Sequence, residues 1–193
     1  SMIGLVTGTT AIGAVFRNAY LEQAELGDAL TRNAAMARAS KEEQKALEEQ
    51  VKKLGRTTSF TAKQVAEAQK YEIMAGYNPE TVLKITPKLL DFSVASGEEL
   101  ASASDIITDN LDAFGMKIQD IDKLLDVMSS TATNTNTDIS MLGETYKYIA
   151  PVSRGFDSFE EINVMLGILA NNGIKAGQAG RNLAGVYTRL SNS

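Results

Sequence analysis

Apolar residues recur along most of the chain at a spacing that places them on one side of an α-helix. From residue 82 onwards, four segments repeat the spacing i, i+3, i+7, i+10, which marks a narrow apolar stripe. A narrow stripe cannot shield a lone helix, so these helices must bury their stripes against one another. No segment shows the strict alternation that is typical of a β-strand. The stripes are Val82-Ile85-Leu89-Phe92, Ile118-Ile121-Leu125-Met128, Ile139-Leu142-Tyr146-Ile149 and Phe159-Ile162-Leu166-Leu169, and a further stripe of Leu183, Val186 and Leu190 follows them.

Capping residues mark where the helices begin and end. A Ser or Thr followed three residues later by Glu or Gln predicts a capping box, and glycine or proline predicts a helix end. These signals favour helices of about 12 to 18 residues joined by short loops. We therefore predict an all-α protein, a compact bundle of seven or eight short helices. The predicted starts are Ser40 with Glu43, Thr61 with Gln64, Asn78-Pro79, Ser96 with Glu99, Asp138, and Ser158 with Glu161; the predicted ends or kinks are Gly55, Gly76, Gly115, Pro151 and Gly173.

The chain divides at the first capping box. We expect residues 1–39 to form an apolar or amphipathic N-terminal helical segment and residues 40–193 a helical core module. Residues 1–16 carry no charge, and Gly4 and Gly8 have the GxxxG spacing found between membrane helices. A bilayer needs about 20 apolar residues, however, and Arg17 ends this run. A flexible or packed apolar helix start is favoured, and a membrane-active segment is the alternative. The terminal residues, Ser1-Met2 and Ser193, suggest a piece of a longer protein.

Composition and charge exclude most kinds of catalytic and metal-binding site. The 19 Lys and Arg residues against 24 Asp and Glu give a net charge of −5, so nucleic acid is not expected as a main partner. The absence of His and Cys excludes imidazole bases, thiolate nucleophiles and the usual zinc and haem ligands. Asp120, Asp122 and Asp126 lack the glycine of a calcium loop and are interpreted as a solvated helix face. We predict no enzyme activity, no cofactor and no metal site.

The stretch from Gly173 to Gly180 concentrates small residues. In the simpler interpretation Gly173 ends one helix, and the small residues that follow let the last helix approach a neighbour closely. A backbone anion site is the other interpretation.

An ordered set of short motifs resembles the core region of bacteriophage tail tape measure proteins. The resemblance spans roughly residues 45 to 190, with the motifs in the family's order and at its spacings. Ala176 departs from it, because family members usually have Gly at this position. The motifs are Leu54–Ala62, Val65–Ala68, Ala75–Tyr77, Ala101–Ile107, Phe114-Gly115, Leu142–Glu144, Ile149–Val152 and Leu169–Gly180. The motif positions expected to matter structurally are Phe60, Gly76, Phe114, Gly115, Pro151, Gly173, Gly177, Ala179 and Gly180.

The resemblance implies a structural protein of a phage or prophage. Tape measure proteins occupy the lumen of the tail tube, set its length during assembly and leave through it at infection. The implied partners are the tail tube protein, tail assembly chaperones, tail-tip or baseplate proteins and other copies of the chain. The implied locations are the virion tail and, during assembly, the bacterial cytoplasm. The membrane-active alternative would add a transient contact with the host membrane, and an enzyme such as a peptidoglycan hydrolase is disfavoured by the lack of His and Cys.

A protein that sets tail length need not form one continuous helix in this segment. A continuous helix of 193 residues would measure roughly 290 Å. The glycines and prolines interrupt such a helix, and the apolar stripes require mutual burial. We therefore expect a compact helical module within the longer protein, able to unwind or rearrange inside the tube.

Overall fold

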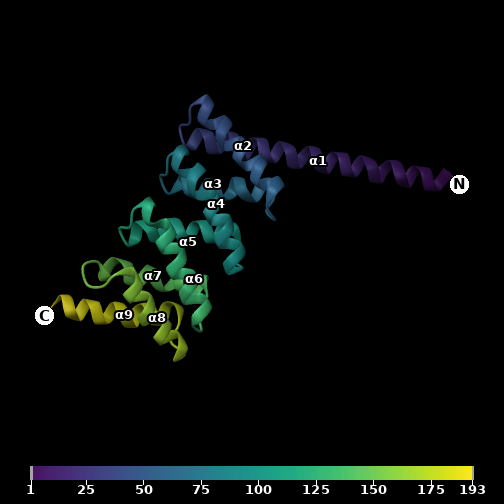
Figure 1. The fold of residues 1–193 in the computed structure, drawn as a ribbon. Helices are drawn as coiled ribbons and strands as arrows, with labels where there is room; N and C mark the ends of the chain where they lie inside the picture. The colour runs from purple at the N-terminus through teal and green to yellow at the C-terminus, as the bar shows by residue number, and fades with distance from the viewer. Residues whose placement is uncertain (1, 193) are drawn as a thin grey trace.

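The regular elements of the chain are all helical in the part that the structure describes. A computed structural model describes the backbone of residues 2–192 and the side chains of Ala14, Arg17 and residues 20–192 (Figure 1). The all-α prediction is confirmed, with nine α-helices in the described residues instead of seven or eight. They are α1 (Met2–Met36), α2 (Lys41–Thr57), α3 (Ala62–Met74), α4 (Pro79–Ser96), α5 (Leu100–Ala113), α6 (Ile121–Asn134), α7 (Ile139–Ser153), α8 (Phe159–Asn171) and α9 (Ala176–Ser191), with a single 3₁₀ turn, η1 (Ile118–Asp120), before α6.

The helices stack in two rows. Substantial contacts join each helix to its neighbour in the chain or to the next helix but one. Helices α1, α3, α5, α7 and α9 therefore form one row and α2, α4, α6 and α8 the other, with α7 and α9 in the most extensive contact (Figure 1). Three ion pairs also join helices two apart: Glu25 to Lys63 at 2.9 Å, Lys88 to Asp122 at 2.6 Å and Lys123 to Glu160 at 2.7 Å.

The predicted apolar stripes form the core. All sixteen residues of the four stripes are buried except Ile118 and Leu169, which are half-buried. Most of them belong to one continuous cluster that runs from Leu30 on α1 to Tyr187 on α9. The stripe spacing therefore predicted both the helices and the faces on which they pack.

Most of the predicted caps are formed. Capping boxes close at Ser40, Thr61 and Ser158, and each of these side chains accepts a hydrogen bond from the backbone N–H three residues later at 3.2 Å. Asn78 and Asp138 accept the equivalent bond at 2.9 and 2.7 Å. These bonds satisfy backbone donors that a helix start would otherwise leave without partners.

The capping box predicted at Ser96 and Glu99 is wrong. Helix α4 continues through Ser96, whose hydroxyl donates to the carbonyl of Phe92 at 2.8 Å. The helix ends at Gly97, which adopts a left-handed conformation with φ of +74°. Glu99 is itself the cap of α5 and makes no side-chain capping bond. The glycine decides the boundary because it stops α4 one residue after the serine.

Gly55 does not end its helix, as the sequence had suggested. Helix α2 runs on to Thr57, and Gly55 faces the start of α3. A Cβ atom on Gly55 would lie 2.6 Å from the backbone nitrogen of Ala62. The residue is small to allow a close helix approach, which local sequence alone cannot distinguish from a cap.

The first helix is longer than the length of about 12 to 18 residues that the sequence predicted for the helices. The 35 residues of α1 form one helix that extends well beyond the helices it packs against (Figure 1). Its C-terminal part is anchored by the buried residues Leu30 and Ala34, and Asn33 donates to the carbonyl of Ala66 at 2.8 Å. The division into segments 1–39 and 40–193 stays a prediction.

One carboxylic acid lies inside the core. Glu72 on α3 is fully buried, and one of its oxygens accepts a hydrogen bond from the Thr86 hydroxyl at 2.8 Å. The other oxygen has no partner among the described residues. Burial raises the pKa of Glu72 to about 8, because the charged form cannot be hydrated there.

Replacing Glu72 by Gln tests this buried acid. The pKa of Glu72 rises from 4.5 to about 8 on folding, so its stabilising contribution is complete below about pH 4.5 and is lost as the pH rises towards 8. The loss should approach about 1.4 kcal/mol per pH unit in that window. Urea unfolding should therefore show that Glu72→Gln flattens the pH dependence and exceeds the wild type in stability above about pH 8.

The matched control is Glu67→Gln, an exposed position on the same helix, which should keep the wild-type pH profile. An unchanged profile in Glu72→Gln would contradict the role assigned to the buried carboxyl group.

Candidate interaction surface

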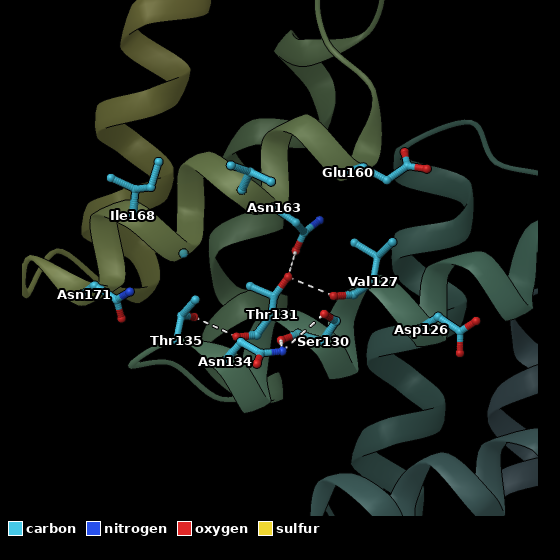
Figure 2. Close-up of a pocket in the computed structure, with 12 residues that line it drawn as sticks. Asp126, Val127, Ser130, Thr131, Asn134, Thr135, Glu160, Asn163, Ile168 and Asn171 are labelled. Atoms are coloured by element: carbon cyan, nitrogen blue, oxygen red, sulfur yellow. Dashed lines mark hydrogen bonds between the residues drawn. The ribbon is translucent and has the colours of Figure 1, made fainter.

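An apolar groove lies between α6 and α8 (Figure 2). The two helices run in the same direction, because Thr131 meets Asn163 at 3.3 Å and, one to two turns further along, the N–H of Asn136 donates to Asn171 at 2.8 Å. The groove has a volume of about 580 Å³. Its lining comprises Asp126, Val127, Ser130, Thr131, Asn134 and Thr135 of α6 and its C-cap, and Glu160, Asn163, Val164, Gly167, Ile168 and Asn171 of α8.

The floor of the groove is held by hydrogen bonds, while one wall is apolar and exposed. Asn163 is buried, accepts from the Tyr146 hydroxyl and donates to the carbonyl of Phe159 at 2.8 Å. Val164 and Ile168, one turn apart on α8, are 63% and 58% exposed. A rigid floor beside exposed aliphatic side chains suits the packing of another apolar surface.

Acidic side chains lie at one end of the groove and two helix C-termini at the other. Asp126 and Glu160 lie at one end (Figure 2), where Glu160 pairs with Lys123. At the other end α6 and α8 both finish without a basic residue in the last turn, so neither last turn offsets the partial negative charge of its helix terminus. Among the described residues, none that lines the groove is basic. An apolar partner with positive charges would complement it.

The acidic cluster noted in the sequence is dispersed. Asp120 accepts from the backbone N–H of Lys117 at 3.0 Å, and Asp122 pairs with Lys88. Asp126 is exposed at the groove. Within the described residues no group of three or more acidic side chains is arranged to hold a metal ion.

The small residues of α9 permit a close approach to α7. Ala179 and Gly180 are buried, and a Cβ on Gly180 would lie 2.7 Å from the carbonyl oxygen of Thr145. A Cβ on Gly177 would lie 2.8 Å from a Glu144 carboxylate oxygen. This is the close helix approach that the simpler interpretation of residues 173–180 expected.

Other motif positions shape the core and the turns. The Phe114 ring packs edge-on against Tyr146 and Phe159, with centroids 5.2 and 4.9 Å away. Gly115 is left-handed, with φ of +68°, and lies beside the Arg154 guanidinium, which donates to the last carbonyls of α5. The remaining positions are Phe60, half-buried before α3; Gly76 and Gly173, left-handed after α3 and α8; and Pro151, two residues before the end of α7.

These nine positions do not converge on one site. They are spread from the loop before α3 to the buried face of α9, and Pro151 is exposed within α7. Their structural importance stays a prediction. The sequence did not identify the α6–α8 groove, because Val164 and Ile168 fall outside the apolar stripe of α8.

The comparisons with known proteins identify the family. Residues 48–193 match the family described as phage-related minor tail protein. The chain belongs to this family. It is 33% identical to the tape measure protein of Pneumococcus phage Dp-1 over 163 residues, and 28% identical to the probable tape measure protein of Escherichia phage P2 over 149 residues. These alignments cover 84% and 77% of the chain. No solved structure gives a significant match.

The phage tail protein aligns with only part of each relative. The aligned region covers 14% of the Dp-1 protein and 18% of the P2 protein. The family and both relatives assign the chain to the phage tail as a structural component. In the part of the chain that the structure describes, no helix combines the length and apolar character needed to cross a bilayer. The membrane-active alternative rests on residues 1–16, whose side chains, apart from Ala14, lie outside the described residues, and it stays a prediction.

Gly180→Ala tests the contact between α7 and α9. The added methyl group would clash with backbone, so we expect a loss of about 1–3 kcal/mol in the free energy of unfolding. Gly185→Ala is the control on the same helix, since no described atom lies within 4 Å of a Cβ there, and it should stabilise by up to about 1 kcal/mol. Chemical unfolding measures both, and equal effects would contradict the close approach.

Ala176→Gly tests a strained backbone position. Ala176 has φ of +48°, and its carbonyl accepts from the Thr145 hydroxyl at 2.9 Å. Glycine should relieve about 1 kcal/mol of left-handed strain and raise the melting temperature. Ala184→Gly, inside α9, should instead lower stability by about 1 kcal/mol. Destabilisation by both changes would show that Ala176 is not strained.

Proposed function

We propose that this chain is a segment of a tape measure, which occupies the lumen of the tail tube and helps to set tail length during assembly. The observation that carries the proposal is the similarity to two tape measure relatives over most of the chain. A wholly helical array with an apolar groove and a projecting helix suits a protein that works through helix-mediated contacts.

The fold suggests how such a segment would contribute length. At 1.5 Å per residue, α1 alone spans about 52 Å. The stacked helices α2–α9 contribute far less length per residue, because the chain reverses between them. We propose that this module rearranges towards a continuous helix inside the tube, where each residue would add the full helical rise.

Partners follow from the same proposal. The tail tube protein, tail assembly chaperones and tail-tip or baseplate proteins would contact the outer helix faces, first in the cytoplasm of the infected cell and then in the virion tail. The α6–α8 groove is the described surface best suited to receive an apolar helix face.

Tail length is the measurement that tests the proposal. In the phage or prophage that encodes the protein, an in-frame duplication of residues 40–193 should lengthen the tail by about 1.5 Å for each added residue, as measured by electron microscopy. A genome recoded over the same region without any residue change is the control. Normal-length tails that incorporate the duplicated protein would contradict a length-setting role. A smaller but definite increase would support the ruler and contradict the rearrangement.

A further inference from the structure

Helix α9 presents an apolar face that the described residues leave exposed. The sequence placed Leu183, Val186 and Leu190 on one stripe, but only Leu183 is buried. Helix α9 instead packs on α7 through its small residues, while the buried Tyr187 lies beside Phe156 and donates to Asp157, both after the end of α7. Val186 and Leu190, one turn apart, are 48% and 56% exposed. With Arg189 between them in sequence, they define the outer face of α9.

The charge of α9 is opposite to that of the groove. Helix α9 contains Arg181 and Arg189 and no acidic residue, and Lys175 caps its start. Arg189 belongs to the outer face, whereas Arg181 lies over the Tyr148 ring of α7. The groove carries Asp126 and Glu160 at one end and two helix C-termini at the other. A basic helix with an exposed apolar face and an apolar groove with acidic side chains at one end therefore occur on the same chain.

The side-chain spacings also agree. Val164 and Ile168 on the groove wall are four residues apart, as are Val186 and Leu190 on α9. Rows of side chains at this spacing on two helices interdigitate as ridges and grooves. Within one copy the pairing is not made, because α9 stacks on α7 in the other row while the groove lies between α6 and α8 (Figure 1).

We propose that the outer face of α9 from one copy docks into the α6–α8 groove of a second copy. The contact joins two different surfaces, so a dimer keeps one unused groove and one unused α9 face. Further copies can then add in the same head-to-tail manner and give a ring or an open chain. Because both surfaces belong to this chain, the inference stands independently of its role in measuring tail length.

Complementary variants test the docking. Ile168→Glu places a charge in the groove, and Val186→Glu places one on α9; both positions are exposed, so each variant should keep wild-type helicity by circular dichroism. Sedimentation velocity should show concentration-dependent association of the wild-type chain. Each variant alone should associate at least about tenfold more weakly, the factor that corresponds to 1.4 kcal/mol. An equimolar mixture should form dimers, because it supplies one intact groove and one intact α9 face.

Val94→Glu is the control, since Val94 is an exposed apolar residue on α4 outside both surfaces, and this variant should associate as the wild type does. Three results would overturn the proposal. The first is a wild-type chain that stays monomeric, which would leave the groove to a different partner. The second is undiminished association of Val186→Glu, which would indicate groove-to-groove pairing. The third is a mixture of the two variants that stays monomeric.

Discussion

Mutual burial of narrow apolar stripes, between helices one or two places apart in the chain, holds this structure together. Each stripe is too narrow for a helix to be stable alone, so every helix depends on the one stacked against it. The aromatic contacts of Phe114, Tyr146 and Phe159 and the three ion pairs between alternate helices reinforce this stacking. The two rows follow from it, since a helix that packs on its second neighbour leaves the intervening helix to the opposite row.

Two surfaces that this stacking leaves exposed are suited to packing against another apolar surface. The α6–α8 groove combines a hydrogen-bonded floor with exposed aliphatic side chains. The outer face of α9 combines the exposed aliphatic side chains of Val186 and Leu190 with the basic residue Arg189. The proposed role in the phage tail, in which the chain assembles with other tail components, would require such surfaces.

The sequence predicted the features that depend on residues close together in the chain, namely the helices, their buried faces and most of their starts. Stripe spacing identified the helices and their buried faces, and capping signals at Thr61 and Ser158 located helix starts. Tertiary packing determined the rest. Gly55 is small because α3 crosses it, and Val186 is exposed because α9 turns Tyr187 towards the core instead. The groove could not be predicted, because it arises where two separate helices meet beside residues that are outside any stripe.

The arrangement in rows has a mechanical consequence. Within residues 2–192, substantial contacts occur only between helices that are one or two places apart in the chain. No such contact joins the first helices directly to the last ones. A pull applied at one terminus would detach the helices one after another, each against the resistance of its immediate neighbours alone. The maximum force would then stay nearly constant however many helices were added, which suits the rearrangement proposed inside the tail tube.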